Sequence, residues 1–490
     1  MKTTLKINYI AAAMAICLVS AGCVKNFVEI NTNPNNSNTA SPQSLIGPLL
    51  LSTLNNTLTR NFRINNELMQ VTVTTADSRE FHRYEIRPAE SEYMWRNWYL
   101  ALTNVRDIYT SAAAGQQPGY QTYQGISLIL DAWISSLLTD MFGDVPYFDS
   151  NKGRDFIITA KFDAQPAIYA DLFQKLDSAN QLLKLGALPE TDDVRALDPI
   201  YNTDPNLWRR FGNSLYLRLL LRVAHKEELD AIDKIKEMID INPGEYPLFR
   251  SNADNAILLY TGQQPYITAF HTARDFDFNG DKGYAEFFIN NLLTLNDPRL
   301  PILATQATLG VYSGMQSGYP RGSVPQREST LHAPMKSNSR LGGNMMNYGE
   351  LQLLLAEAAL KGYIDKDPTA YYRNGVYAGV EFWDAEIDDT YFDNPAANFA
   401  EADTDNEKLK MIHFQKYLTL LFTDFQQWYE YRRTGALDLY RGPGLENNGQ
   451  MPSRLNYPII VQSLNKANYD AAVAAMGGDS INEKVWWQRQ

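Results

Sequence analysis

The chain has 490 residues, of which 44% are hydrophobic, and it carries 44 Lys and Arg against 56 Asp and Glu. This hydrophobic content is enough to fill a sizeable core, which excludes intrinsic disorder as the main state. The net charge of −12 argues against a nucleic-acid partner, because phosphates are repelled by an acidic surface. Aromatic residues make up 12% of the chain and include 29 Tyr, which suggests contact with a ligand.

The first 22 residues have the features of a secretory signal peptide. Lys2 and Lys6 form a basic start, and residues 10–19 are apolar. Ten helical residues rise only about 15 Å, half of the hydrocarbon core of a bilayer, so this segment is too short to span a membrane. Small residues then precede Cys23, a pattern that resembles a bacterial lipobox with Ser at the position where Leu is commonest. We therefore expect the leader to be removed and Cys23 to be acylated.

Cysteine usage supports a lipid anchor. Cys17 lies within the leader, so Cys23 would be the only cysteine of the mature chain and no intrachain disulfide could form. Loss of Lys2 and Lys6 leaves 42 basic residues (44 minus 2) against 56 acidic ones, a charge of −14. An Asn-rich stretch with turn chemistry follows. Residues 23–44 are therefore expected to be a lipidated Cys and a flexible tether that holds the protein at a membrane surface.

Helical periodicity dominates the remainder, residues 45–490, which we expect to form a single helical domain. Apolar residues recur at helical spacing over 45–58, 94–109, 126–141, 168–183, 207–223, 348–360, 370–383 and 409–428. Strand-like alternation is sparse and short. The small residues Ala356 and Ala359 predict a close helix pair of the tetratricopeptide type, and long loops rich in Gly, Pro and Tyr connect the helices.

Motifs for catalysis are missing from the sequence. The five His residues are too far apart for an HExxH pair or zinc-finger spacing, and neither a phosphate loop nor a GxSxG motif is present. A catalytic cysteine is excluded because both cysteines lie in the leader or at the anchor. The carboxylate pair of a glycoside hydrolase is a spatial feature, so the sequence leaves that alternative open.

One segment has the spacing of a calcium-binding loop. It matches the EF-hand pattern D-x-[DN]-x-[DN]-G-x5-E, in which oxygen ligands alternate and a carboxylate closes the loop. The candidate ligands are Asp275, Asp277, Asn279, Asp281 and Glu286. Against calcium, Lys282 adds a positive charge where such loops place an apolar residue. The alternative is an acidic loop that caps a helix starting near Tyr284.

A series of landmarks along the chain resembles the SusD/RagB family of Bacteroidetes outer-membrane nutrient-binding lipoproteins, in its SusD-like branch. The landmarks occur in a shared order over about 350 residues. They are 139–147, 161–163, 208–218, 296–300, 356–358, 415–417, 428–435, Arg454 with 457–458, and the closing Trp486 and Trp487.

The resemblance implies a mostly α SusD-like fold, in which tetratricopeptide-like helix pairs form a superhelical scaffold beside an irregular, loop-rich half. It implies a surface-exposed lipoprotein of the outer membrane that passes captured oligomeric nutrients to a SusC-like TonB-dependent transporter. Most such proteins are thought to bind glycans, and some branches take peptides. No enzymatic activity and no required cofactor are expected. A structural Ca²⁺ at the loop described above is a candidate that rests on the spacing of that loop alone.

The charged landmark residues are interpreted as parts of the scaffold. They lie in or beside expected helices, where charges cap ends and tie neighbouring helices together: Asp140, Asp144, Arg218, Glu357 and Arg432. Trp208, Phe211, Leu215 and Leu219 share one helical face, which is core spacing.

Ligand contact is expected instead from aromatic residues in the loops, because sugar C–H surfaces stack on flat rings and loops are exposed. The candidates are Phe81, Tyr84, Tyr266, Tyr312 and Tyr319. The alternatives are peptide cargo, which needs polar groups that read a backbone, and, with less support, a lipid-anchored glycoside hydrolase.

Overall fold

The computed structural model describes residues 41–490 except 78–79, 116–118, 189–190 and 490. The expected signal peptide, Cys23 and most of the tether lie outside these residues. Helices predominate, and strands are few and short. The helices are α3 Pro42–Arg60, α4 Asn66–Leu68, α5 Glu90–Gly115, α6 Tyr120–Phe142, α7 Gln165–Leu185, α8 Asp192–Arg195, α9 Pro205–Arg222, α10 Ala231–Lys236, α11 Asp275–Asn279, α12 Glu286–Leu295, α13 Leu300–Leu303, α14 Tyr348–Leu360, α15 Pro368–Glu381, α16 Asp405–Thr419, α17 Gln426–Thr434, α18 Ile459–Leu464 and α19 Lys466–Met476.

Two small antiparallel pairs of strands complete the regular structure. Strand β1 (Thr72–Thr74) pairs with β3 (Lys282–Tyr284), and β2 (Ala256–Ile257) pairs with β4 (Asn344–Met346). Each pair joins segments that are distant in the chain, so the strands fasten loops to the helical part of the molecule.

Seven of the eight expected helices are confirmed, with ends that differ by a few residues. The expectation of one helix over 409–428 is wrong, because α16 ends at Thr419 and α17 begins at Gln426. Between them Phe422 (φ 60°) and Asp424 (φ 32°) take left-handed backbone conformations, which end a right-handed helix. All six residues of this turn, 420–425, are buried and four of them are apolar, so the apolar pattern of the sequence continues across the break.

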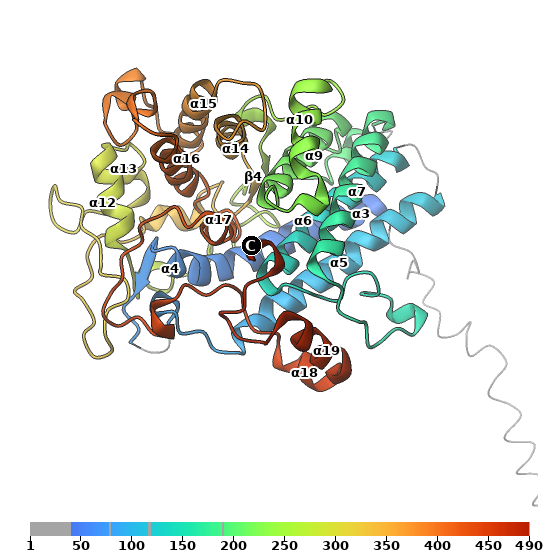
Figure 1. The fold of residues 1–490 in the computed structure, drawn as a ribbon, viewed down its shortest axis with the longest axis horizontal. Coiled ribbons are helices and arrows are strands. Elements are labelled where there is room, and N and C mark those ends of the chain that lie inside the picture. Colours follow the sequence, from blue (N-terminus) through green and yellow to red (C-terminus); the bar gives the residue numbers. More distant parts are fainter. Residues whose placement is uncertain (1–40, 78–79, 116–118, 189–190, 490) are drawn as a thin grey trace, which may run out of the picture. The chain divides into compact units, whose positions relative to one another are not determined.

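Consecutive helices pack side by side on both sides of the molecule. Helix α5 packs on α3 and α6, α6 on α7, and α7 on α9, while α14 packs on α15 and α16. Figure 1 shows α14, α15 and α16 as a group at the top and α5, α6, α7 and α9 on the right. The face that bears Trp208, Phe211, Leu215 and Leu219 is fully buried, which confirms its interpretation as core.

Helix α6 is long and apolar enough to cross a membrane by length and composition alone. However, 94% of its most apolar window is buried within the protein. It contacts α5, α7 and α9. A helix that is apolar on all sides is expected at the centre of a large helical core, and α6 has that position.

Glycines set the close approach of α14 and α15. A Cβ atom on Gly375 would lie 2.6 Å from Cγ of Leu353 and 3.1 Å from the carbonyl oxygen of Gly349. A Cβ atom on Gly349 would lie 3.0 Å from the backbone nitrogen of Gly379. The predicted close helix pair is therefore present, and glycines lie at its closest contacts.

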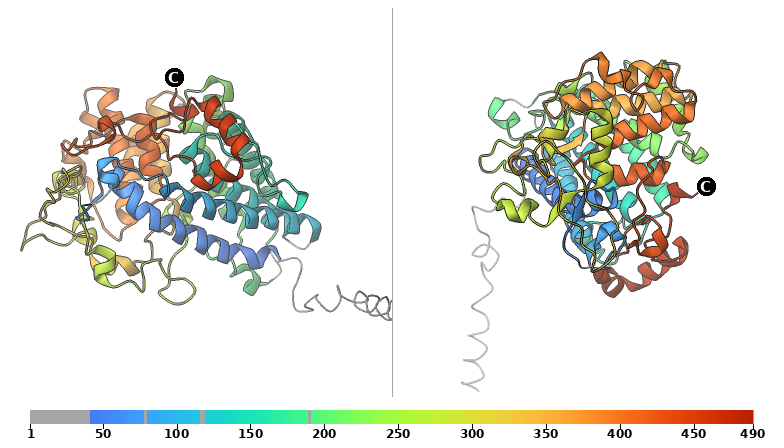
Figure 2. Two further views of the ribbon diagram at one scale, coloured as in Figure 1. Left: turned by 90° about the horizontal axis from the view of Figure 1, so that it is seen from below. Right: turned by 90° about the vertical axis from the view of Figure 1, so that its left-hand side faces the viewer.

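The long loops gather beside α12 and α13. Figure 2 shows this loop-rich part facing the viewer in its right-hand view. It contains residues 261–283 and 309–344, with α11 as a short helix within the first of them. The helical part thus supports a surface built from loops, which tolerate changes in sequence more readily than helices do.

Replacement of Gly375 by Val should destabilise the protein by about 1–3 kcal/mol, because the added atoms overlap Leu353 in a packed interior. The matched control is Gly244→Val, since Gly244 is exposed and has nothing within 4 Å of an added Cβ. Chemical denaturation measures both free energies of unfolding, and equal values for the two variants would contradict a close helix contact at Gly375.

Candidate ligand-binding site

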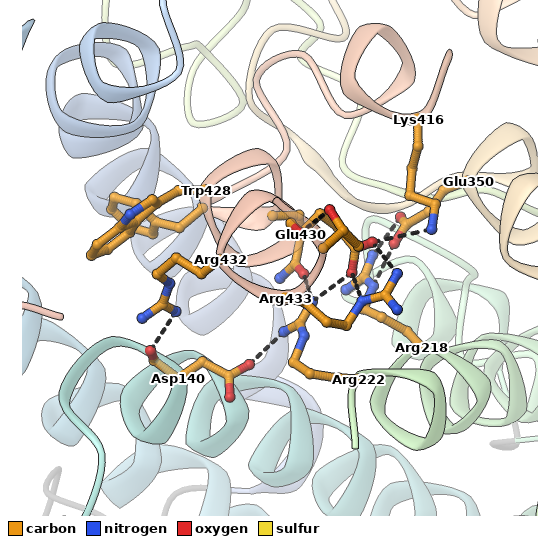
Figure 3. A network of polar contacts seen from close by, with 12 residues as sticks. Asp140, Arg218, Arg222, Glu350, Lys416, Trp428, Glu430, Arg432 and Arg433 are labelled. Atoms are coloured by element: carbon orange, nitrogen blue, oxygen red, sulfur yellow. Dashed lines mark hydrogen bonds and ion pairs between the residues drawn. The ribbon is translucent and has the colours of Figure 1, made fainter. Parts of the chain in front are cut away.

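The charged landmark residues form a buried ion network rather than a ligand site. Arg218 on α9 makes a bidentate pair with Glu350 on α14, with both N···O distances 2.6 Å. Arg222, one turn further along α9, pairs with Asp140 on α6. Glu357 on α14 accepts two hydrogen bonds of 2.7 Å from Arg433 on α17. Figure 3 shows Arg218 pointing toward Glu350, and Arg222 toward Asp140, between the helices.

Cations hold the centre of the network in its charged form. Burial alone would raise the pKa of Glu357, but Arg433 and Lys416 hold the pKa of this carboxyl well below its usual range. His413 and Glu430 lie close enough to Glu357 to share a metal ion with it. Lys416 already bonds both carboxylates, at 2.9 and 3.1 Å. The cationic side chains of Lys416 and Arg433 therefore supply the positive charge that a metal ion would bring to these carboxylates.

The network also includes a buried histidine and an arginine that packs on tryptophan rings. Burial lowers the pKa of His413 to about 3, so this imidazole is neutral at physiological pH. The Arg432 guanidinium lies 4.4 Å from the ring centre of Trp428 and 4.9 Å from that of Trp487, distances typical of cation–π contacts. Its Nη2 donates to the carbonyl oxygen of Asp140 at 2.6 Å. The structural interpretation of Asp140, Arg218, Glu357 and Arg432 is thus confirmed.

Three of the five loop aromatics are buried, so the expectation that they offer exposed rings is wrong. Phe81, Tyr84 and Tyr319 are exposed by only 1%, 5% and 1%. Tyr319 stacks on His82 with ring centres 4.7 Å apart, and its hydroxyl donates to the carbonyl oxygen of Thr74 at 2.9 Å. These rings fasten the loop that contains Tyr319 to strand β1 and do not present a stacking surface.

Tyr266 and Tyr312 are half-buried and pack against the main core with part of each side chain. Their location in the loops agrees with the sequence-based expectation, and ligand contact by either remains a prediction. Both stay candidates because part of each side chain remains accessible to solvent.

Sequence reasoning missed the most exposed apolar residues of the loops. Leu309 is 96% exposed at the tip of a tight hairpin closed by a bridge between Thr308 and Val311. Phe276 on α11 is 71% exposed. The signal in the sequence was weak, because a lone Leu or Phe in a loop is as often packed as exposed.

Hydrogen bonds connect the segments that carry these residues. Arg327 Nη1 donates to the carbonyl oxygen of Asn279 at 3.3 Å, beside α11. Ser313 and Ser329 exchange hydrogen bonds of 3.1 and 2.9 Å, which brings the Leu309 hairpin next to the segment that contains Arg327. We name the surface formed by Phe276, Leu309, Val311, Tyr312 and Arg327 the loop face. It combines apolar side chains with a guanidinium, as ligand contact requires.

The EF-hand geometry expected from the spacing is not present. Residues Asp275–Asn279 form a helix, α11, in place of the open first half of a calcium loop. The candidate ligands are committed elsewhere: Asp275 pairs with Lys336 at 2.5 Å, and Asp277 with Arg274 at 2.7 Å. The alternative of an acidic loop capping a helix near Tyr284 is wrong as well, because Lys282–Tyr284 form strand β3 and α12 begins at Glu286 after Ala285, with no side-chain cap. Calcium binding itself remains an untested prediction.

Comparisons with known proteins agree with this architecture. Residues 34–458 match the family model of SusD-like proteins described as "starch-binding associating with outer membrane". The chain belongs to the SusD-like family. A solved SusD homologue from Bacteroides fragilis is 23% identical with a TM-score of 0.79, over 92% of this chain and 100% of that one. A chitin-binding protein is 25% identical with a TM-score of 0.76, over 91% and 99% of the two chains.

A SusD-like protein from Bacteroides thetaiotaomicron shares the fold at a TM-score of 0.72 and 22% identity, over 89% of this chain and 98% of that one. The comparison with curated protein sequences gave no match. The mostly helical SusD-like fold is therefore confirmed by the structure and by its solved relatives.

Replacement of Glu350 by Ala should lower the free energy of unfolding by about 3–5 kcal/mol, since it leaves the buried Arg218 charge without its partner. Lys466→Ala is the matched control, because the Lys466–Asp470 pair is exposed and such pairs contribute about 1 kcal/mol or less. Thermal and denaturant unfolding measure both changes. A Glu350→Ala variant as stable as the control would show that the network is not needed for the fold.

Proposed function

We propose that the protein binds oligomeric glycans outside the cell and passes them to a partner TonB-dependent transporter in the outer membrane, without altering them chemically. The observation that carries the proposal is the loop face on a SusD-like scaffold. The scaffold spans nearly the whole described chain, and the loop face presents apolar side chains beside polar groups. Glycans combine apolar C–H faces with hydroxyl groups, so this mixture matches them.

The relatives support glycans over other cargo. The family is described as starch-binding and as associating with the outer membrane. The structure named as a chitin-binding protein covers 91% of this chain. On this proposal the lipid anchor at Cys23 keeps the protein at the membrane. The net negative charge of the chain disfavours binding to a nucleic acid.

A non-catalytic role is consistent with the use of buried charges in the structure. The buried acidic and basic groups of the network neutralise one another and hold helices together. A general acid with a raised pKa beside a second carboxylate in an open cleft would be needed for glycoside hydrolysis. Burial raises the pKa of Glu67 to about 7 and that of Asp424 to about 6. Both side chains are buried, with exposures of 1% and 5%, so neither faces an open cleft.

The proposal is tested with the soluble protein, lacking residues 1–23, against starch and chitin oligosaccharides and a set of peptides. Phe276→Ala and Tyr312→Ala should each weaken glycan binding by about tenfold through loss of ring contact. Phe156→Ala is the matched control, as Phe156 is 91% exposed in a different loop. Isothermal titration measures the affinities.

Binding of peptides but not glycans would favour the alternative cargo, and release of shortened sugars from a bound glycan would favour a hydrolase. Unchanged glycan affinity in both loop variants would remove the loop face from the proposal.

A further inference from the structure

A second candidate site lies away from the loop face, where helices α5 and α7 meet the loop of residues 147–155. It is a cavity of about 730 Å³, in the range of small-ligand sites. In Figure 1 α5 and α7 are on the right, whereas the loop face lies beside α12 and α13 on the left. Sequence reasoning missed this cavity because its walls come from three separate segments.

The wall and floor of the cavity are held rigidly by Arg106 on α5. Its guanidinium donates to Asp131 at 3.0 Å and to both the carbonyl and the hydroxyl oxygen of Ser150 at 2.8 Å. Lys175 on α7 donates to Asp131 at 2.8 Å and to the hydroxyl of Tyr147 at 2.7 Å. Burial alone would raise the pKa of Asp131, but Lys175 and Arg106 lower this pKa to about 2. The Asp131 carboxylate therefore stays charged, and its bonds to Arg106 and Lys175 fix all three side chains.

Phe148 supplies an oriented, partly exposed aromatic ring. It lines the cavity and is 41% exposed. Its ring meets that of Tyr147 edge-on, with centres 4.9 Å apart and planes at 76°. The backbone nitrogens of both residues donate to the Asp163 carboxylate, at 3.1 and 2.9 Å. A ring held from one side in this way offers its other side for stacking without a large entropic cost.

Carboxylates balance the positive charges of the cavity. Lys175 lies 3.3 Å from Asp171 in addition to its bond with Asp131. At the rim Arg154 pairs with Asp107 at 3.3 Å, and both side chains are well exposed. Exposed pairs of this kind are weak, so the Arg154–Asp107 pair can open and each side chain can bond a hydroxyl group of a ligand instead. Lys152, which also lines the cavity, pairs with Asp149 at 3.3 Å. With each lining cation paired in this way, an anionic ligand would find no surplus of positive charge.

We propose that this cavity is a second glycan-binding site, which takes a neutral oligosaccharide segment. One sugar would stack on Phe148, while its hydroxyls bond the charged groups of the rim, Arg154, Asp107 and Asp171. The ligand class rests on the proposed function, but the location does not depend on the loop face. Two sites on different sides of one chain would let the protein hold a long or branched glycan at two points, which raises its effective affinity.

The experiment titrates the soluble protein with chitin and starch oligosaccharides and compares two variants of the same loop. Phe148→Ala removes the ring that lines the cavity, and Phe156→Ala removes an exposed ring that does not line it. We expect Phe148→Ala to weaken one class of binding sites by about tenfold and Phe156→Ala to leave it unchanged. Thermal unfolding of both variants should match that of the unmodified protein.

A further arm tests the charge argument. Because the paired cavity carries no surplus positive charge, the affinity for the neutral glycan should be the same at low and high salt. An oligosaccharide of uronic acids should not bind there.

The outcomes separate this inference from the proposed function. If the unmodified protein binds neutral glycans and Phe148→Ala binds them equally well, the cavity is not a glycan site and the proposed function stands. If the unmodified protein binds no glycan, both the glycan role and the second site are overturned. Preference for the uronic acids that weakens with salt would also overturn the second site as described, since its ligand would then be an anion.

Discussion

The fold depends on charges that are shielded from water. Arg218 and Arg222 leave the same helix, one turn apart, and reach carboxylates on two other helices, Glu350 on α14 and Asp140 on α6. Glu357 and Glu430 then bind Arg433 and Lys416, which adds α16 and α17. Removal of one partner would leave a charge in a medium of low dielectric, where it is costly. The helices on the two sides of the molecule are therefore fixed in one register.

In this arrangement the residues of the sequence motifs are different from the residues that can contact a ligand. The residues with the strongest motif character, such as Arg432 and Trp428, are stacked on one another in the interior. The residues that face outward in the loops, such as Leu309 and Phe276, belong to no motif. A motif in this chain therefore identifies the scaffold, and the cargo has to be inferred from surfaces that the motifs do not include.

The helical part of the fold could be predicted from the sequence because a period of 3.6 residues is a local property. The break between α16 and α17 could not, since the turn is as apolar as the helices that it separates. The exposure of the loop aromatics could not be predicted either. Whether Tyr319 is exposed depends on His82, which packs on it from a distant part of the chain. The calcium pattern matched at each of its specified positions despite Lys282, but Lys336 and Arg274 neutralise two of its acids, and only the structure brings Lys336 near.

The buried rings at the base of the loops have a consequence for how such a protein diversifies. Tyr319, His82 and strand β1 form a small anchored unit, while the hairpin that carries Leu309 has open space around its tip, with nothing within 4 Å of a Cβ atom added to Gly310. A change of length in a surface loop costs little free energy, so the tip of the hairpin can be lengthened, shortened or exchanged while its base stays in place. Ligand specificity can then change through the tip of the hairpin alone, while the anchored base and the helical scaffold keep their structure.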